Sequence, residues 1–137
     1  MSNEGAPIVN GLMAAISTGD LDAITELLDP ELVSHGALGD VHGPDGFVQV
    51  MVSNVRTAYP DVHVEAVGVI QEGGMISWRI EGSATHTGPF LGLPPTGKRI
   101  RIQGIHQARL RNGRIVEHWQ GPDILAMLVD MGRIPFS

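Results

Sequence analysis

The stretch RIRIQGIHQARLRNGRIVEHWQ, residues 99–120, decides the fold class of this chain. In its first part, every second residue from 100 to 110 shares one face of an extended strand, and the residues between them are polar except Ile105. That face consists of Ile100, Ile102, Gly104, His106, Ala108 and Leu110. Asn112-Gly113 is a typical two-residue hairpin turn, and residues 115–120 resume the extended pattern. The stretch therefore predicts a long strand and a shorter one, paired antiparallel through a tight turn.

The sequence before this hairpin predicts two further antiparallel strands. Residues 62–68 and 76–84 both alternate, and the turn residues Gly73 and Gly74 lie between them. Gly82 and Gly104 interrupt the alternation, which favours bends or close backbone approaches in a curved sheet. Four consecutive strands of this kind predict an antiparallel sheet.

Helical patterns occupy most of the first half and the end of the chain. Apolar residues at helical spacing begin at Ile8, and Gly19 ends that run. Asp20 is a suitable N-cap for a second helix, which Pro30 is expected to stop. Residues 31–35 are a short strand or a turn, a third helix follows over residues 43–58, and Pro122 favours the first turn of a closing helix.

Helices segregated from an antiparallel sheet indicate the α+β class. We predict one domain over residues 1–137, with a curved antiparallel β-sheet wrapped around helices. A sheet curved in this way around a long helix forms a cone-shaped α+β barrel with an internal pocket.

Composition excludes several classes of function. The 137 residues carry a formal net charge of −6, so nucleic acid is not expected as a partner. There is no cysteine, which excludes disulfides, thiolate metal sites and a cysteine nucleophile, and which fits a reducing cytoplasm. No apolar run approaches the roughly 18 residues of a membrane span, and no signal peptide is evident. We expect a soluble cytoplasmic protein that does not bind membranes.

The segment HTGPFLGLPPTGK, residues 86–98, resembles the signature loop of the SnoaL-like polyketide cyclases. The later GRIVEHW, residues 113–119, followed by Asp123, is similar to a second pattern of that family. The early LVSH, residues 32–35, fits as well, so the resemblance covers nearly the whole chain. The second pattern alone is less specific, because it recurs across the wider ketosteroid-isomerase-like, nuclear-transport-factor-like cone fold.

The resemblance implies a cofactor-independent enzyme that closes a ring of a polyketide by intramolecular aldol condensation, in natural-product biosynthesis. It implies an apolar, polycyclic, polyketide-like substrate and a homodimer or homotetramer. The step Asp130-Met131-Gly132 departs from the family pattern, and relatives under the same family label hydroxylate, open epoxides or cyclise ethers. A hydroxylase, an epoxide hydrolase, an ether cyclase and a non-catalytic small-molecule-binding module therefore remain alternatives.

Asp123 is the first catalytic candidate. An aldol closure needs a base for the carbon acid and a donor for the developing alkoxide. Asp123 lies where the last strand meets the closing helix, four residues after Trp119. The helix dipole stabilises its carboxylate, whereas burial against Trp119 would raise its pKa. The alternative interpretation is that Asp123 only caps the helix.

Two histidines are the other catalytic candidates. His106 lies on the apolar face of its strand, where it could donate to a substrate carbonyl or protonate an alkoxide. His35 lies in the short early segment, where the resemblance suggests a polar pocket residue. His118 and Trp119 alternate, so only one of them faces the pocket, and we expect Trp119 to do so.

Five side chains are expected to bind the substrate, since each could line an apolar pocket for a flat polycyclic ligand. They are Trp119, Trp78, Phe90, Met51 and Met127. No two histidines show the spacing of a metal-binding pair, so no metal is expected. No dinucleotide fingerprint is present either, so we expect no cofactor.

Overall fold

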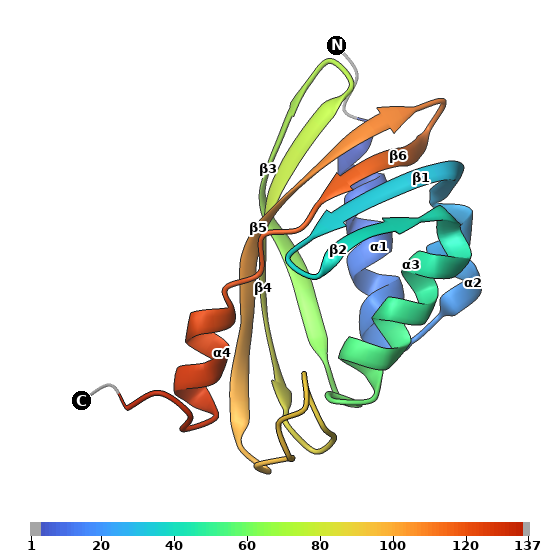
Figure 1. The fold of residues 1–137 in the computed structure, drawn as a ribbon. Coiled ribbons are helices and arrows are strands. Elements are labelled where there is room, and N and C mark those ends of the chain that lie inside the picture. The colour runs from blue at the N-terminus through green and yellow to red at the C-terminus, as the bar shows by residue number, and fades with distance from the viewer. Residues whose placement is uncertain (1–3, 136–137) are drawn as a thin grey trace.

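A computed structural model describes residues 4–135, apart from the side chains of Val52 and Ser53. Its centre is one six-stranded sheet with the strand order β2-β1-β6-β5-β4-β3. The sheet is curved and does not close on itself (Figure 1). The strands are β1 Leu28–Gly36, β2 Gly39–His42, β3 His63–Glu72, β4 Met75–Thr85, β5 Arg99–Arg111 and β6 Arg114–Trp119. Strands β3 to β6 are antiparallel neighbours, so the α+β class and the antiparallel arrangement predicted for these four strands are confirmed.

The register of β4 and β5 sets the two faces of the sheet. Trp78 pairs with His106 and Ile80 pairs with Gly104, so these residues share one face. Ile100 and Ala108 of that face are buried, whereas Arg99, Arg101, Ile105, Gln107, Arg109 and Arg111 of the other face are exposed and Gln103 is partly exposed. We call the first face the inner face and the second the outer face.

One pair of strands differs from the predicted antiparallel sheet. β1 pairs with β6 in parallel, with Ser34 opposite His118. β1 begins at Leu28 and includes Pro30, at which the second helix was expected to stop. Pro30 falls where the β1–β6 register shifts between Leu28 and Val33, and such an irregularity tolerates a residue without an N–H donor.

The helices lie on both sides of the sheet. They are α1 Gly5–Thr18, α2 Leu21–Glu26, α3 Gly43–Met51 and α4 Ile124–Asp130, and a π-helical turn η1, Val52–Arg56, follows α3. Gly19 ends α1 and Asp20 caps α2, as predicted. α1, α2 and α3 lie on one side of the sheet, and α4 lies on the opposite side of β5 (Figure 1). Arg101 on the outer face of β5 bonds Asp130 of α4 at 2.8 Å, which holds this helix there. None of the described helices is long and apolar enough to span a membrane.

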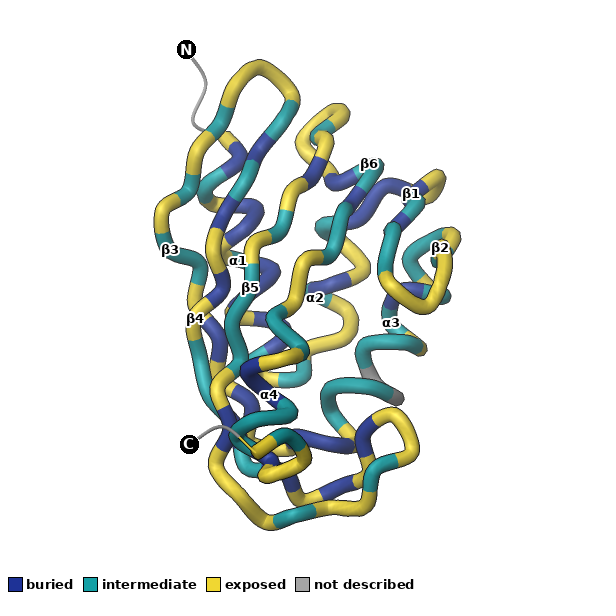
Figure 2. The backbone as a smooth tube through the Cα atoms, turned by 60° about the vertical axis from the view of Figure 1, so that its left-hand side comes forward, coloured by how far each residue is buried: buried dark blue, intermediate teal, exposed yellow. Residues whose placement is uncertain are grey.

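The core fills the space between the inner face and the first helices. Buried backbone runs through α1 and the middle of the sheet, and exposed backbone lies at the turns (Figure 2). The completely or almost completely buried side chains include Val9, Leu12, Ile24, Leu32, Tyr59, Ile76, Trp78, Ile100 and Ile115.

Gly82 allows β3 and β4 to approach closely, and we expect Gly82→Ala to destabilise the fold. A Cβ at Gly82 would lie 2.0 Å from the carbonyl oxygen of His63, which is rigid backbone. The expected loss is about 2–3 kcal/mol of unfolding free energy in urea titrations. Gly74→Ala is the matched control, because its Cβ would meet only Leu110 O at 3.4 Å. Equal stability of the two variants would refute this explanation.

Candidate active site

A chain of polar side chains crosses the inner face of the sheet. His106 Nδ1 lies 3.2 Å from His118 Nε2, and His118 Nδ1 lies 3.0 Å from Ser34 Oγ. Gln120 Nε2 donates to the same Ser34 Oγ at 3.1 Å. His118 and Ser34 are buried, whereas His106 and Gln120 are partly exposed. The chain thus runs from a buried middle to a partly accessible imidazole at one end.

Strand register brings these four residues together. His118 of β6 lies opposite Ala108 of β5 and also opposite Ser34 of β1. His106 lies two positions before Ala108 on the same face of β5. Gln120 is two residues beyond His118, and its backbone N–H bonds His35 O and extends the β1–β6 pairing.

Aromatic rings pack around the two histidines. Trp78 stacks on both, with ring centroids 5.8 Å from His106 and 6.0 Å from His118. Phe47 of α3 meets His118 edge-on at 5.8 Å. The indole Nε1 of Trp78 is buried, and no hydrogen-bond partner for it occurs among the described residues. Trp78 therefore adds an unused N–H donor to the same part of the core.

Burial keeps both imidazoles neutral. Desolvation lowers the pKa of His106 to about 4. Desolvation, followed by repulsion from His106 and His35, lowers the pKa of His118 to about 3. A neutral imidazole has one N–H donor and one acceptor nitrogen, so at pH 7 each ring can pass a hydrogen bond along the chain.

Asp123 lies apart from this chain. Its Oδ1 accepts from Ala126 N–H at 3.0 Å and caps α4, and its Oδ2 accepts from Gln103 Nε2 at 3.0 Å. These two bonds, first that from Gln103, lower the pKa of the carboxyl group. Gln103 is on the outer face of β5, three residues from His106, so Asp123 and His106 lie on opposite faces. The catalytic role predicted for Asp123 stays a prediction.

His35 and Trp119 also lie on the outer face. His35 bonds Glu117 at 2.8 Å and Asp40 at 2.9 Å, and these bonds, in that order, raise its pKa. Its ring stacks on Trp119 with centroids 5.5 Å apart. The prediction that Trp119 faces inward is wrong, because the register that places His118 over the core turns its neighbour Trp119 outward beside Gln107. The structure thus brings neither His35 nor Asp123 to His106.

The other predicted substrate-binding residues occupy different parts of the molecule. Phe90 is buried against Tyr59, with ring centroids 5.5 Å apart, and Met127 is buried in α4. Met51 is partly exposed at the end of α3. Of the five, Trp78 alone contacts the histidine pair in the ring contacts described above. Within residues 4–135, no group of three or more histidine or acidic side chains is arranged to hold a metal ion.

Sequence reasoning missed Ser34, His118 and Gln120. The only signal for His118 was its alternation with Trp119, and the larger apolar residue was preferred for the inside. Ser34 and Gln120 carried no signal, because the parallel pairing of β1 with β6 brings them together.

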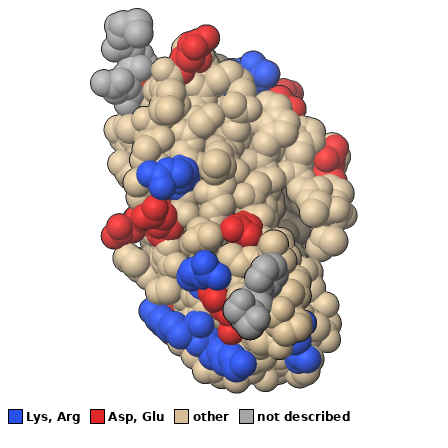
Figure 3. Space-filling model, turned by 90° about the vertical axis from the view of Figure 1, so that its left-hand side faces the viewer, with Lys and Arg blue, Asp and Glu red and all other residues tan. Residues whose placement is uncertain are grey.

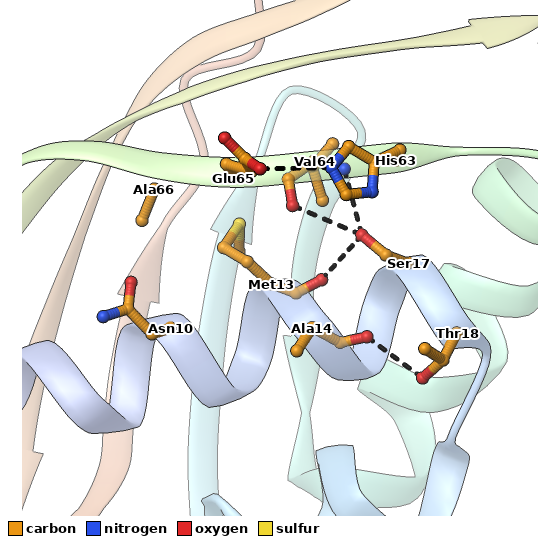
Figure 4. Close-up of a pocket in the computed structure, with 9 residues that line it drawn as sticks. All are labelled: Asn10, Met13, Ala14, Ser17, Thr18, His63, Val64, Glu65 and Ala66. Carbon is orange, nitrogen blue, oxygen red and sulfur yellow. Dashed lines mark hydrogen bonds and ion pairs between the residues drawn. The ribbon is translucent and has the colours of Figure 1, made fainter.

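Two shallow grooves lie elsewhere on the surface. One, of about 430 Å³, runs between α1 and β3 (Figure 4). There Ser17 Oγ donates to Met13 O and accepts from Val64 N–H, which ties the helix to the strand. The other, of about 630 Å³, lies beside α2 and the start of α3. Neither groove includes His106 or His118, so the internal pocket predicted from the sequence is neither of them.

This chain is similar to a family model, to curated proteins and to solved structures. Residues 7–131 match the model of the SnoaL-like polyketide cyclase family. Aklanonic acid methyl ester cyclase DauD of Streptomyces sp. (strain C5) is 27% identical over 91% of this chain and 80% of its own. Nogalonic acid methyl ester cyclase of Streptomyces nogalater is 27% identical over 88% of this chain and 92% of its own. The crystal structure of wild-type IdmH from Streptomyces antibioticus is 31% identical, covers 96% of this chain and 99% of its own, and superposes with a TM-score of 0.82.

Proposed function

Because the chain belongs to the SnoaL-like polyketide cyclase family, we propose that it closes a ring of a polyketide ester by intramolecular aldol condensation. The named relatives are cyclases of aklanonic and nogalonic acid methyl esters. A substrate of the same chemical class would be flat, largely apolar and rich in carbonyl groups. These features suit a site with stacked aromatic rings and hydrogen-bond donors.

The proposed reaction is an isomerisation. A proton leaves the carbon that the ester carbonyl acidifies, and the resulting carbanion attacks a ketone carbon of the same molecule. One carbon–carbon bond forms, and the ketone oxygen becomes an alkoxide that takes up a proton. The proton lost and the proton gained balance, so the scheme consumes no cofactor or co-reactant.

The observation that carries the proposal is the neutral His106 at the accessible end of the buried polar chain. A neutral imidazole whose pKa is lowered can polarise a carbonyl through its N–H, without the desolvation cost of a buried imidazolium. We assign His106 this role: it donates to the ketone oxygen and stabilises the alkoxide. Trp78 stacks on His106 and is itself buried, so its substrate-binding role stays a prediction. The substrate-binding roles of Phe90, Met51, Met127 and Trp119 stay predictions, and Trp119 and α4, which carries Met127, lie on the side of β5 opposite His106.

Two schemes are considered for the group that removes the proton from the substrate carbon. To act as the base, Asp123 would have to release Ala126 and Gln103 and turn to the other face of β5. Its lowered pKa also makes it a weak base. We therefore propose that solvent base removes the proton. The sequence-based role of Asp123, with His35 as the next choice, is retained as the second scheme.

Asp123→Asn distinguishes these schemes. Asparagine keeps the helix cap but cannot take up a proton. We expect kcat with aklanonic acid methyl ester and the melting temperature both to stay near the wild-type values. Asp123→Ala, which removes the cap, should lower the melting temperature and leave kcat of the folded enzyme unchanged. A fall in kcat of about 10²–10⁴-fold in Asp123→Asn would instead establish Asp123 as the base.

We further propose that the enzyme is a cytoplasmic homodimer joined partly through the outer face of the sheet. On the side that carries α4, most of the surface is uncharged and the charged side chains form small groups of both signs (Figure 3). The outer-face residue Ile105 is 64% exposed and Leu125 of α4 is 53% exposed, which favours burial against a partner. The cysteine-free sequence supports the cytoplasmic location.

Light scattering tests the proposed dimer. At micromolar concentration we expect twice the chain mass of 14.6 kDa, and Ile105→Lys should shift the protein toward the monomer. A wild-type mass equal to that of one chain would contradict the dimer.

A further inference from the structure

We propose that Gln120 sets the tautomer of His106, acting through Ser34 and His118 as a positioning residue. Three hydrogen bonds connect Gln120 Nε2 to Ser34 Oγ, Ser34 Oγ to His118 Nδ1, and His118 Nε2 to His106 Nδ1. The consequence of this tautomer for catalysis rests on the proposed function, whereas the tautomer itself does not.

The donor-to-acceptor direction of these hydrogen bonds follows from counting donors and acceptors, beginning at Gln120. Its amide nitrogen only donates, so Ser34 Oγ accepts there. The hydroxyl of Ser34 has one hydrogen of its own, and its side chain is completely buried. Among the described residues, His118 Nδ1 is the other atom in hydrogen-bond contact with this hydroxyl, so the hydrogen goes to Nδ1. The opposite direction would leave a buried hydroxyl hydrogen without an acceptor.

The same count of donors and acceptors determines the tautomer of both histidines. Since Nδ1 of neutral His118 accepts, its hydrogen is on Nε2 and points to His106 Nδ1. Nδ1 of His106 therefore also accepts, and the single hydrogen of its neutral ring is on Nε2. All bonds in the chain then point the same way, which strengthens each of them. His106 Nε2–H, at the accessible end, is the donor that the proposed reaction requires.

Gln120 controls this direction because an amide has a donor at one end and an acceptor at the other. Its Oε1 lies on the side of Gly36, 3.2 Å from where a Cβ of that glycine would be. A carboxylate at this position could only accept, so Ser34 would donate to it and accept from His118 Nδ1–H. His118 Nε2 would then accept from His106 Nδ1–H. His106 Nε2 would be left as a bare acceptor, which reverses its chemical character.

Nitrogen-15 NMR of the histidine side chains tests this inference without any substrate. At pH 8 we expect wild-type His106 and His118 to be protonated at Nε2 and unprotonated at Nδ1. Gln120→Glu should move both hydrogens to Nδ1. Gln107→Glu is the matched control: the outer-face Gln107 bonds Ser77, and its substitution adds the same charge without touching the chain. Ser34→Ala removes the hydroxyl that links Gln120 to His118, so adding Gln120→Glu to this variant should leave both tautomers unaltered.

Two results would overturn the inference: Nδ1–H on wild-type His106, or unchanged tautomers in Gln120→Glu. The wild-type spectrum decides the first even where a variant fails to fold. Turnover is a separate readout. We expect Gln120→Glu to lose kcat about 10²-fold with little change in KM, as for loss of a transition-state donor. Reversed tautomers with unchanged kcat would refute the donor role of His106 in the proposed function and leave the positioning by Gln120 intact.

Discussion

His106→Leu is expected to lower kcat for ring closure of aklanonic acid methyl ester by about 10²–10³-fold, the usual effect of removing one donor from an oxyanion site. Leucine approximates the volume of the imidazole and keeps the contact with Trp78, so the fold should persist. KM should change little, because the lost hydrogen bond is strongest when the ketone oxygen becomes an alkoxide. Steady-state kinetics with circular dichroism of the same samples measures both effects.

Two further variants make the His106 result specific. His106→Gln places an amide N–H on a side chain of similar reach, and it should recover part of the lost kcat. His63→Leu removes a histidine from the exposed strand β3, far from the polar chain, and should behave as wild type. If His106→Leu turns over normally while folded, the donor lies elsewhere and the proposed site is wrong.

The second large effect is a loss of stability in mild acid. The pKa values of His106 and His118 are about 4 and about 3 in the folded protein, against 6.5 for an ordinary histidine. Below pH 6.5 the unfolded chain binds a proton at each of these residues and the folded chain does not, so stability falls as the pH falls. The slope between pH 6 and 4.5 approaches an upper limit of about 2.7 kcal/mol per pH unit, or about 1.4 for each histidine. His86 acts in the same sense, since desolvation lowers its pKa too, whereas the raised pKa of partly exposed His35 opposes the effect weakly.

Urea titrations at pH 7.5, 6 and 5 measure this dependence, with each free energy of unfolding taken from a two-state transition. His106→Leu should remove one of the two protons and reduce the slope by roughly half. His63→Leu is again the control, because it removes an exposed histidine without touching the buried pair. Constant stability from pH 7.5 to 5 would show that the two imidazoles are not buried and neutral in the folded protein.

The fold was predictable wherever the signal is local. Period-two alternation and the Asn112-Gly113 turn correctly predicted β5, β6 and their antiparallel pairing. Gly19 and Asp20 likewise marked the junction between the first two helices. The parallel pairing of β1 with β6 was not predictable, because it joins segments more than 80 residues apart and leaves no pattern in either. The side on which α4 packs depends on Arg101 and Asp130, whose contact is also non-local because the two residues are 29 positions apart.

In the candidate site, too, the features with a local sequence signal were predictable and those that depend on non-local pairing were not. Alternation correctly placed His106 on the buried face, and it also implied that one of His118 and Trp119 points inward. Hydrophobicity favoured Trp119 for the inner face, yet the strand register places His118 there, and its ring nitrogens are hydrogen-bonded to Ser34 and His106. Asp123 has the local signature of a helix cap, and a cap is what its contacts make it in the structure.

Incubation of the purified protein with aklanonic acid methyl ester, followed by mass spectrometry, distinguishes ring closure from the alternative reactions. An aldol closure is an isomerisation, so we expect a new chromatographic species with the same mass as the substrate. In deuterated water the product should carry one carbon-bound deuterium fewer than a substrate pre-labelled at the acidic carbon. A product heavier by one oxygen atom would indicate hydroxylation, one heavier by a water molecule would indicate hydrolytic opening, and either would contradict the assignment as a cyclase.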